Sequence, residues 1–353
     1  MIEIDGSYGE GGGQILRTAV SLSALTMTPV RISNIRAGRQ KPGLKRQHIA
    51  GIEVTGKIVG AEIRGLDVGS STVEFVPRER HGGTIQYDVG TAGSISLVLQ
   101  AALPPAVLSP EPIQFDLRGG TDVKWSPPVD YVNKVFVHTL MSLGPKIELR
   151  QKRRGHYPKG GGLVICDVSP VDSITPLKSI KRKNLRSVVG VSHCVRLPRH
   201  IAERQAATAE DMILEHLSVK SDIVRESYPK EGDSHLGPGS GIVIWAESED
   251  GIRIGADSLG ERGKTAEQVG NEAASKLITE VESGMAIDSH LCDMLIPYLA
   301  VAGGDSEIGV TKITSHLTTN IWAVEHILGT SIKLQGKIGE PGTVSIKGKG
   351  LSL

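Results

Sequence analysis

Residues 12–26, GGQILRTAVSLSALT, begin in a run of glycines and continue with apolar residues at helical spacing. A short strand and a second helix are predicted next. That helix ends at Gly60, because glycine is favoured just past a helix end. The predicted order is helix, strand, helix, strand, strand, over residues 12–26, 29–35, about 44–59, 61–66 and 71–76.

The same order of elements returns twice along the chain. The second copy has helices at 92–103 and 128–143, and the third has helices at about 287–300 and 315–328. The glycines that follow the second helices lie 84 and then 185 residues apart, so about one hundred residues are inserted before the third unit. Each unit has an apolar helix face that only packing between units can cover. The strands predicted in these copies are 112–117, 146–151, 162–168, 307–311, 331–336 and 342–347.

Residues 184–283 fit this gap and differ in charge from the rest. They carry 11 Lys and Arg against 17 Asp and Glu, a net charge of −6, whereas the remainder has +7. The negative charge makes the insert a poor nucleic-acid binder. Its predicted elements are strand 187–195, helix 198–217, strands 222–227, 241–248 and 251–257, and helix 265–282. The predicted fold class is α/β (α+β): a domain of three repeated units, 1–183 and 284–353, with a smaller inserted α/β domain, 184–283.

Composition excludes several classes of protein. The chain has 353 residues with 39% hydrophobic and 22% charged residues, which is typical of a folded globular protein. No apolar run is long enough to span a membrane, and the N-terminus lacks the features of a secretory signal. The three cysteines form no CxxC pair, which favours a reducing, cytoplasmic location. Only 12 aromatic residues argue against a stacking platform for single-stranded nucleic acid.

A stretch without acidic residues separates Glu10 from Glu53. A block of one charge sign inside a structured segment indicates either an anion site or a solvated basic face. Arg36 and Arg39 lie in the loop RAGRQKPG, where paired arginines suit bidentate contacts to phosphate. The basic residues of the stretch are Arg17, Arg31, Arg36, Arg39, Lys41, Lys45 and Arg46.

The N-terminal glycine loop, GSYGEGGGQILR at 6–17, precedes a helix start. Such a loop offers backbone N–H groups and the positive end of a helix dipole to an anion, although a tight turn has the same composition. It is not a Walker A loop, because no Gly-Lys-Ser/Thr follows. Glu10 within a phosphate-binding loop requires a cation, and Mg²⁺ binds through one or two carboxylates together with substrate phosphates.

His316 begins a predicted helix, with Asn320 one turn later on the same face. The helix dipole favours neutral imidazole there, which can act as nucleophile or base; a capping or packing role is the alternative. Gln100 is polar on an apolar helix face, and Pro128 belongs to a rigid loop that could pack on a flat base. Either Asp122 or Asp130 is interpreted as the cap of the helix at 128–143. No functional role is predicted for His138, His156, His326 or the four histidines of the insert (His193, His200, His216 and His235).

The motifs GEGGGQILR, RAGRxKPGL, RGGTD and HLTTN together resemble those of RNA 3′-terminal phosphate cyclases, and the resemblance runs from end to end. It implies three units similar to the C-terminal domain of bacterial translation initiation factor three, with a thioredoxin-like insert. It also implies ATP-dependent conversion of an RNA 3′-phosphate into a 2′,3′-cyclic phosphodiester, aided by Mg²⁺ or Mn²⁺. AMP is first transferred to a histidine as a phosphoramidate, then to the RNA as an adenylate, and is finally expelled by the ribose 2′-OH.

The resemblance assigns roles to individual residues of this chain. His316 matches the nucleophile, and Glu10 matches the metal-binding glutamate. The residues matching the phosphate and metal pocket are Arg17, Arg36, Arg39 and Gln47. The positions around the nucleotide are Gln100, Pro128, His290, Asp293 and Asn320. This chain departs from the pattern of bacterial members at His290 and Met294, where those members tend to have Tyr and Gln. RNA with a 3′-terminal phosphate and ATP are the implied partners, with no membrane and no obligate protein partner.

Three other functions compete with this interpretation. A ribosome-assembly relative of the cyclases keeps the fold but lacks the nucleophile, whereas this chain has His316. An enolpyruvyl transferase uses six comparable units, and only three fit here. A plain RNA-binding module explains the basic stretch but not Glu10 beside it. Consumption of ATP separates such a module from an enzyme.

Overall fold

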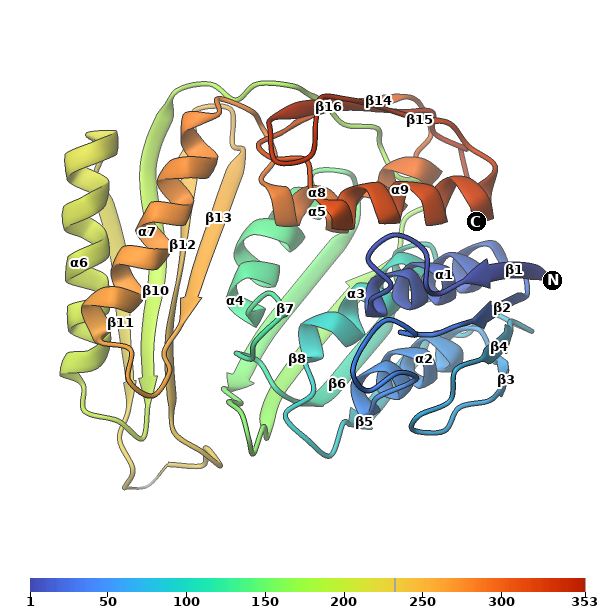
Figure 1. Ribbon diagram of the computed structural model, residues 1–353, viewed down its shortest axis with the longest axis horizontal. Helices are drawn as coiled ribbons and strands as arrows, with labels where there is room; N and C mark the ends of the chain where they lie inside the picture. The colour runs from blue at the N-terminus through green and yellow to red at the C-terminus, as the bar shows by residue number, and fades with distance from the viewer. Residues whose placement is uncertain (232, 353) are drawn as a thin grey trace.

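Three of the four β-sheets in the computed structural model, which describes residues 1–231 and 233–352, share one strand order (Figure 1). In each, the first strand pairs in parallel with the second, and the fourth lies antiparallel between the second and third. A parallel neighbour requires a crossover connection, and a helix lies in each one. The structure is therefore a mixed α/β fold.

The bounds of the elements follow the chain. The first sheet and its helices comprise β1 (Ile2–Asp5), α1 (Gly13–Thr26), β2 (Val30–Ser33), α2 (Arg46–Ile58), β3 (Glu62–Arg64) and β4 (Val73–Val76). The second comprises β5 (Gly83–Asp88), α3 (Ile95–Val107), β6 (Ile113–Gly119), α4 (Val129–Tyr131), η1 (Val132–Val137), α5 (His138–Met141), β7 (Lys146–Arg153) and β8 (Gly162–Ser169). The third comprises β9 (Lys178–Ser179), α8 (Ser289–Val301), β14 (Ser306–Val310), α9 (Ser315–Leu328), β15 (Ile332–Gln335) and β16 (Gly342–Ile346).

Two features differ from the sequence prediction. Each of these sheets begins with a strand before its first helix, and the predicted order omitted β1, β5 and β9. β9 has only two residues, too few for an alternating pattern to be recognised, whereas β1 and β5 do alternate in polarity and the prediction overlooked them. The helix predicted at 128–143 is divided, since a π-helical segment, η1, separates α4 from α5.

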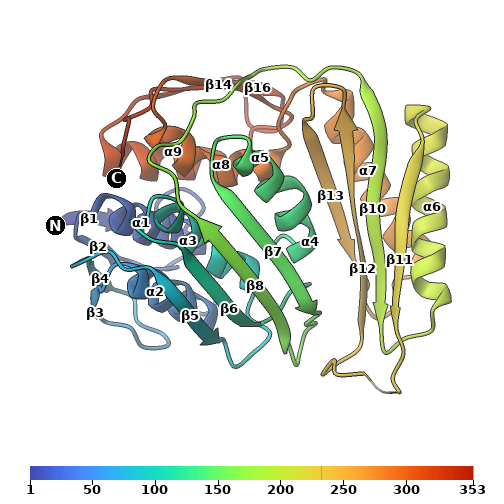
Figure 2. The same ribbon diagram turned by 180° about the vertical axis from the view of Figure 1, so that it is seen from behind.

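The helices pack against one another between the sheets. α1 contacts α2, α3 and α9, and α8 contacts both α3 and α9. Leu22, Leu99, Leu295 and Val324 lie in this layer, one from each of α1, α3, α8 and α9, and all are fully buried. Seen from behind, β5, β6, β8 and β7 lie side by side across α3 (Figure 2). This packing brings the first turns of α1 and α9 together.

The segment between β9 and α8 forms the fourth sheet. Its elements are β10 (Leu185–Val195), α6 (His200–Leu217), β11 (Ser221–Tyr228), β12 (Gly239–Ser248), β13 (Arg253–Leu259) and α7 (Ala266–Glu282), with strand order β11-β10-β12-β13. α6 and α7 cover one face over a separate apolar cluster. Val191, Val243 and Trp245 belong instead to the main core, so the other face of the sheet packs on the rest of the molecule (Figure 1).

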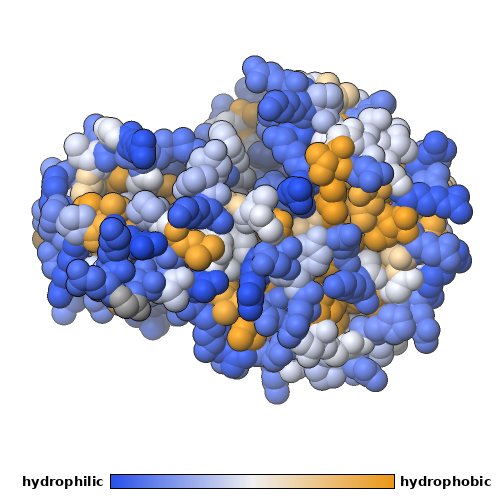
Figure 3. All heavy atoms as spheres, turned by 90° about the horizontal axis from the view of Figure 1, so that it is seen from below, coloured by the Kyte–Doolittle hydropathy of each residue, from blue (hydrophilic) through white to orange (hydrophobic). Residues whose placement is uncertain are grey.

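Viewed from below, the segment 185–282 forms the smaller lobe (Figure 3). Hydrophilic side chains cover most of this face, and apolar residues gather only in small separate groups. No helix in the described ranges 1–231 and 233–352 is long and apolar enough to cross a membrane.

Candidate active site

The glycine loop before α1 is held in a conformation that glycine adopts readily. Gly9 and Gly11 have φ values of 59° and 57°, in the left-handed region. Gly12 precedes α1 in extended conformation, and no side chain caps the helix there. The first N–H groups of a helix have no partner within it, so the N-terminus of α1 presents donors and a positive dipole end. Glu10 lies in the middle of this loop.

His316 lies in the first turn of α9. Thr314 caps that helix, because its Oγ1 accepts a hydrogen bond from the N–H of Leu317 at 2.9 Å. The Nδ1 atom of His316 lies 2.7 Å from Oε2 of Glu10 and also contacts Oε1 of Gln14. Both oxygens accept, so Nδ1 carries the proton and Nε2 keeps its lone pair. The side chain of His316 is 48% exposed, which leaves the ring accessible.

The surroundings keep His316 neutral near pH 7. Burial lowers the pKa of the imidazole, and the positive charges of Arg17 and Arg39 lower it further, as does His290. The carboxylate of Glu10 acts in the opposite direction but does not reverse the shift. A neutral ring with a fixed Nδ1 proton can act as a nucleophile through Nε2.

A small pocket opens beside His316, between α1, α3, α8 and α9. Nε of Arg17 donates to Oε1 of Gln100 at 3.1 Å, and burial lowers the pKa of Arg17 to about 10, so the guanidinium stays charged at neutral pH. Asn320 accepts a 2.6 Å hydrogen bond from Thr18 and donates to the carbonyl of Asp293 at 2.7 Å. The residues lining the pocket are Gln14, Arg17, Thr18, Ser21, Gln100, Asp293, Met294, Pro297 and Asn320.

Asp293 is buried in this pocket, and the only hydrogen-bond partner of its carboxyl group among the described residues is the Thr314 hydroxyl at 3.5 Å. Burial raises the pKa of the Asp293 carboxyl well above its usual value. A protonated carboxyl can donate a hydrogen bond, whereas a carboxylate can only accept. The polar groups of the pocket therefore offer both donors and acceptors to a bound molecule.

The two arginines of the basic loop occupy different environments. Arg36 is buried, and its Nη1 donates to the carbonyls of Lys41 and Gly43 at 2.8 and 2.9 Å, so it holds the loop in shape. Arg39 is half-exposed, and its Nη2 lies 3.4 Å from Oε1 of Glu10. Arg39 thus places a cation directly over the glycine loop.

The remaining predicted residues lie at the starts of three helices. Gln47 is in the first turn of α2, Pro128 immediately precedes α4, and His290 is in the first turn of α8. His290 packs edge-on against Tyr131, with ring centroids 6.4 Å apart. Within 1–231 and 233–352, no hydrogen bond or ion pair joins the side chains of Gln47, Pro128 or His290 to those of Glu10 or His316.

Sequence reasoning missed three polar residues of the site. Gln14 and Thr18 contact His316 and Asn320, and the Thr319 hydroxyl lies 3.4 Å from the N–H of Glu10. A signal was present, because the pocket side of α1 carries polar residues at helical spacing on a helix that is otherwise mostly apolar. The residues of this stripe are Gln14, Arg17, Thr18 and Ser21.

Comparison with known proteins shows which family this chain resembles over nearly its whole length. The family model described as RNA 3′-terminal phosphate cyclase matches residues 8–334. A protein of that name from Methanopyrus kandleri is 53% identical over 350 residues, covering 99% of both chains. Those from Ignicoccus hospitalis and Staphylothermus marinus are each 50% identical, over 99% and 100% of this chain and 99% of their own lengths. The chain therefore belongs to the RNA 3′-terminal phosphate cyclase family of enzymes.

Proposed function

We propose that this protein uses ATP to convert the 3′-terminal phosphate of an RNA into a 2′,3′-cyclic phosphodiester, releasing AMP and pyrophosphate. The observation that carries the proposal is the pairing of His316 with Glu10 and Gln14, which fixes the proton on Nδ1 and leaves Nε2 as a nucleophile. Membership of the family supports the overall reaction. The order of steps below is inferred from the chemistry of these residues.

In the first step, Nε2 of His316 attacks the α-phosphorus of ATP. A nitrogen–phosphorus bond forms, the bond from that phosphorus to the bridging oxygen breaks, and pyrophosphate leaves. The imidazole carries positive charge in the product, which Glu10 stabilises at Nδ1. Arg17 and Arg39 lie close enough to lower the pKa of His316, and their charge also suits the crowded phosphates.

In the second step, an oxygen of the RNA 3′-phosphate attacks the phosphorus bound to His316. The nitrogen–phosphorus bond breaks, His316 is regenerated, and an RNA–adenylate anhydride forms. The ribose 2′-OH then attacks the 3′-phosphorus, loses its proton to solvent and expels AMP. The nucleophile and the phosphorus belong to the same nucleotide, so proximity supplies much of the rate without a further catalytic group.

The other residues would bind ATP and the RNA phosphate. The pocket residues Gln100, Asp293 and Asn320 would contact the nucleotide, and Pro128 and His290, both at helix starts, would contribute from α4 and α8. Arg36 would act by shaping the basic loop that presents Arg39, and Gln47 would contribute from the start of α2. The glycine loop would supply backbone N–H groups to phosphate oxygens.

A divalent cation fits the site through Glu10. Mg²⁺ typically takes one or two carboxylates and completes its coordination with water and substrate phosphates, and Glu10 supplies one carboxylate beside the predicted phosphate position. When bound, Mg²⁺ or Mn²⁺ would neutralise charge on the phosphates. Glu10 would then both ligate the cation and orient His316.

We also infer how the chain is organised. The shared strand order supports three repeats of one unit, in residues 1–183 and 284–353, similar to the C-terminal domain of translation initiation factor three. The separate apolar cluster under α6 and α7 supports a distinct inserted domain at 184–283, with a thioredoxin-like arrangement. A cytoplasmic location is consistent with three free, buried cysteines.

The test is incubation with Mg²⁺ and ATP labelled on its α-phosphate, without RNA, followed by denaturing electrophoresis. We expect an acid-labile label on the protein that is lost in His316→Ala. His326→Ala is the matched control, because His326 lies on the same helix, and its ring contacts the Glu3 carbonyl and stacks on Trp322, away from Glu10 and Gln14. A folded His316→Ala variant that still takes up label would refute the nucleophile. No label on the native protein, even with Mn²⁺ and with pyrophosphate removed, would favour a ribosome-assembly or RNA-binding role.

A further inference from the structure

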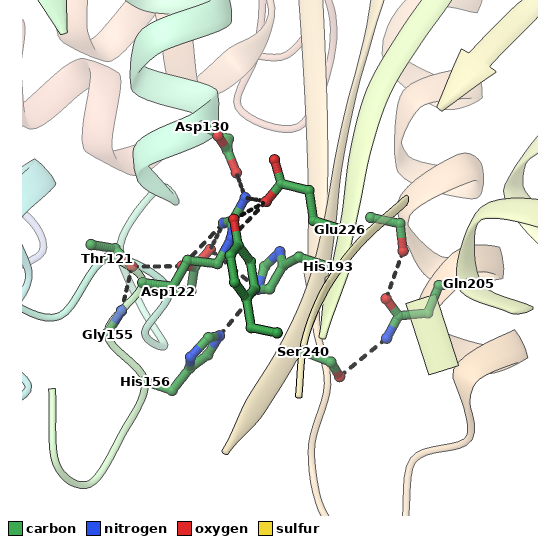
Figure 4. A network of polar contacts seen from close by, with 12 residues as sticks. Thr121, Asp122, Asp130, Gly155, His156, His193, Gln205, Glu226 and Ser240 are labelled. Carbon is green, nitrogen blue, oxygen red and sulfur yellow. Dashed lines mark hydrogen bonds and ion pairs between the residues drawn. The ribbon is translucent and has the colours of Figure 1, made fainter. Parts of the chain in front are cut away.

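A second cluster of ionisable residues lies away from the glycine loop. Among residues 1–231 and 233–352, one group of three side chains brings potential metal-ligand atoms within 4.8 Å of one another: Asp122, His156 and His193. All three are buried. The Nε2 atoms of the two histidines are 3.1 Å apart, and Nε2 of His193 is 3.8 Å from Oδ1 of Asp122 (Figure 4).

The cluster joins two parts of the chain. Asp122 follows β6 and His156 lies between β7 and β8, whereas His193 is on β10 of the inserted segment (Figure 4). Gly239, at the start of β12, provides room for the ring, since a Cβ there would lie 2.1 Å from Cγ of His156. A ligand held by all three residues would therefore clamp the insert to the second sheet.

The spacing of the ligand atoms suits a tetrahedral ion. With metal–ligand distances of about 2.0–2.1 Å, two ligands of a tetrahedral zinc ion are separated by about 3.3–3.4 Å. The measured separations of 3.1 and 3.8 Å lie on either side of this value. The second carboxylate oxygen of Asp122 accepts a 2.6 Å hydrogen bond from Thr121, which fixes the carboxylate and leaves Oδ1 toward the histidines.

The charges around the cluster do not balance without a cation. One buried guanidinium, Arg154, lies within 3.5 Å of three carboxylates. With both histidines neutral, the group has a net charge of −2, or −1 if Asp130 keeps a proton, as its raised pKa favours. Uncompensated charge is costly where the carboxylates are buried, as Asp122 and Asp130 are, and a divalent cation would stabilise it there, whereas the Glu226 side chain is 32% exposed and partly solvated. The three carboxylates are those of Asp122, Asp130 and Glu226.

The two rings face each other through Nε2, 3.1 Å apart. A hydrogen bond between two neutral rings uses one Nε2 lone pair, whereas a cation would be bound by both. With an ion on both Nε2 atoms, each ring carries its proton at Nδ1, and both Nδ1 atoms are buried without a hydrogen-bond partner among the described residues. The stabilisation from the ion must therefore exceed the cost of these two buried donors.

We propose that Asp122, His156 and His193 bind a divalent transition-metal ion, with zinc the best match, and that this ion fixes the insert against the second sheet. Two imidazole nitrogens and one carboxylate oxygen form a donor set typical of zinc and its neighbours, not of Mg²⁺. The site is separate from the cation at Glu10 and does not depend on the proposed function.

The experiment measures metal content and binding on the full-length protein. Protein purified without chelator is analysed for bound metal, then stripped and titrated with Zn²⁺ and with Co²⁺, whose visible absorption reports a four-coordinate site. We expect about one ion per chain and a rise in thermal stability on adding Zn²⁺, both lost in His193→Asn. His138→Ala is the matched control, because His138 also reaches the insert, at the Gly251 carbonyl 3.0 Å away, but lies outside the cluster.

Two further variants make the result decisive. Glu10→Gln should retain the Zn²⁺ ion, which separates this site from the cation at the glycine loop. If His193→Asn is unfolded by circular dichroism, His156→Gln replaces it. The proposal is overturned if the stripped native protein binds neither Zn²⁺ nor Co²⁺, or if folded histidine variants bind them as the native protein does. The cluster would then be a hydrogen-bonded contact between the two parts of the chain.

Discussion

Gly9 offers a sharp test of how the glycine loop supports the site. Its φ of 59° lies in the left-handed region, and a Cβ there would be 2.3 Å from Oγ1 of Thr319. Thr319 is buried, and its hydroxyl donates to the carbonyl of Ser315 at 2.7 Å. Gly9→Ala must therefore displace either Thr319 or the loop that carries Glu10.

The loss of unfolding free energy expected for Gly9→Ala has two parts. Placing alanine in the left-handed region costs about 1–2 kcal/mol, and overpacking against Thr319 adds about 1–3 kcal/mol. Gly329 isolates the first part, because its φ is also 59° and no atom lies within 4 Å of a Cβ there. We therefore expect Gly329→Ala to lower the free energy of unfolding by about 1–2 kcal/mol, and Gly9→Ala by about 2–5 kcal/mol.

The assay combines denaturant unfolding with the rate of self-labelling by ATP. Gly9→Ala should slow labelling by roughly 100-fold, because a displacement of about 1 Å at a reacting group has effects of this size. Gly329→Ala should label at the native rate. The double variant Gly9→Ala/Thr319→Ala lacks the obstructing hydroxyl, so it should regain most of the unfolding free energy that overpacking removes. If the two substitutions are simply additive in stability, the clash does not exist and the reasoning fails.

The remaining predictions concern Arg39, His316 and Thr18. Arg39→Ala should lower kcat/KM for ATP or RNA about 10-fold or more, since charge-assisted contacts contribute about 1.5–3 kcal/mol; unchanged kinetics would contradict a phosphate contact. Because burial lowers the pKa of His316, the ring stays neutral as the pH is lowered from 7, and the labelling rate should fall only below about pH 6.5, where the ring becomes protonated. Glu10→Gln removes a charge that raises this pKa, so the acid limb should move to still lower pH, and an upward move would reverse the argument. Thr18→Val leaves the buried Oδ1 of Asn320 without its 2.6 Å donor, which should cost about 1–3 kcal/mol in denaturant unfolding; native stability would show that the bond contributes nothing.

Helices with local stop signals could be predicted well from the sequence. The helix predicted at 315–328 coincides with α9, where Thr314 caps the start and Gly329 adopts a left-handed conformation after the end. The helix predicted at 92–103 instead runs to Val107, because Pro104 and Pro105 lie inside α3 rather than after it. Proline is normally a helix terminator, and only tertiary burial of the whole segment reveals the exception.

The candidate site could be predicted at the level of residues but not of contacts. Glu10 and His316 were each identifiable from local context, one in a glycine loop and the other at a helix start. Their 2.7 Å contact joins residues more than 300 positions apart, and no local pattern encodes it. Arg36 and Arg39 look equivalent in sequence, yet one is buried against carbonyls and the other is half-exposed beside Glu10.

The histidines between the two parts of the chain show why some functional candidates escape sequence reasoning. In β10 both sheet faces are covered, so the strand has no polar–apolar alternation that would mark one residue as unusual. Ser192 and His193 are nevertheless polar within an apolar run, and both are buried. The Ser192 hydroxyl donates a hydrogen bond to Gln205 of α6 on one face of the sheet. His193 points to the opposite face, so its partners must lie across the interface with the rest of the molecule. A buried polar residue in such a strand therefore indicates what the sheet packs against, and here that surface supplies Asp122 and His156.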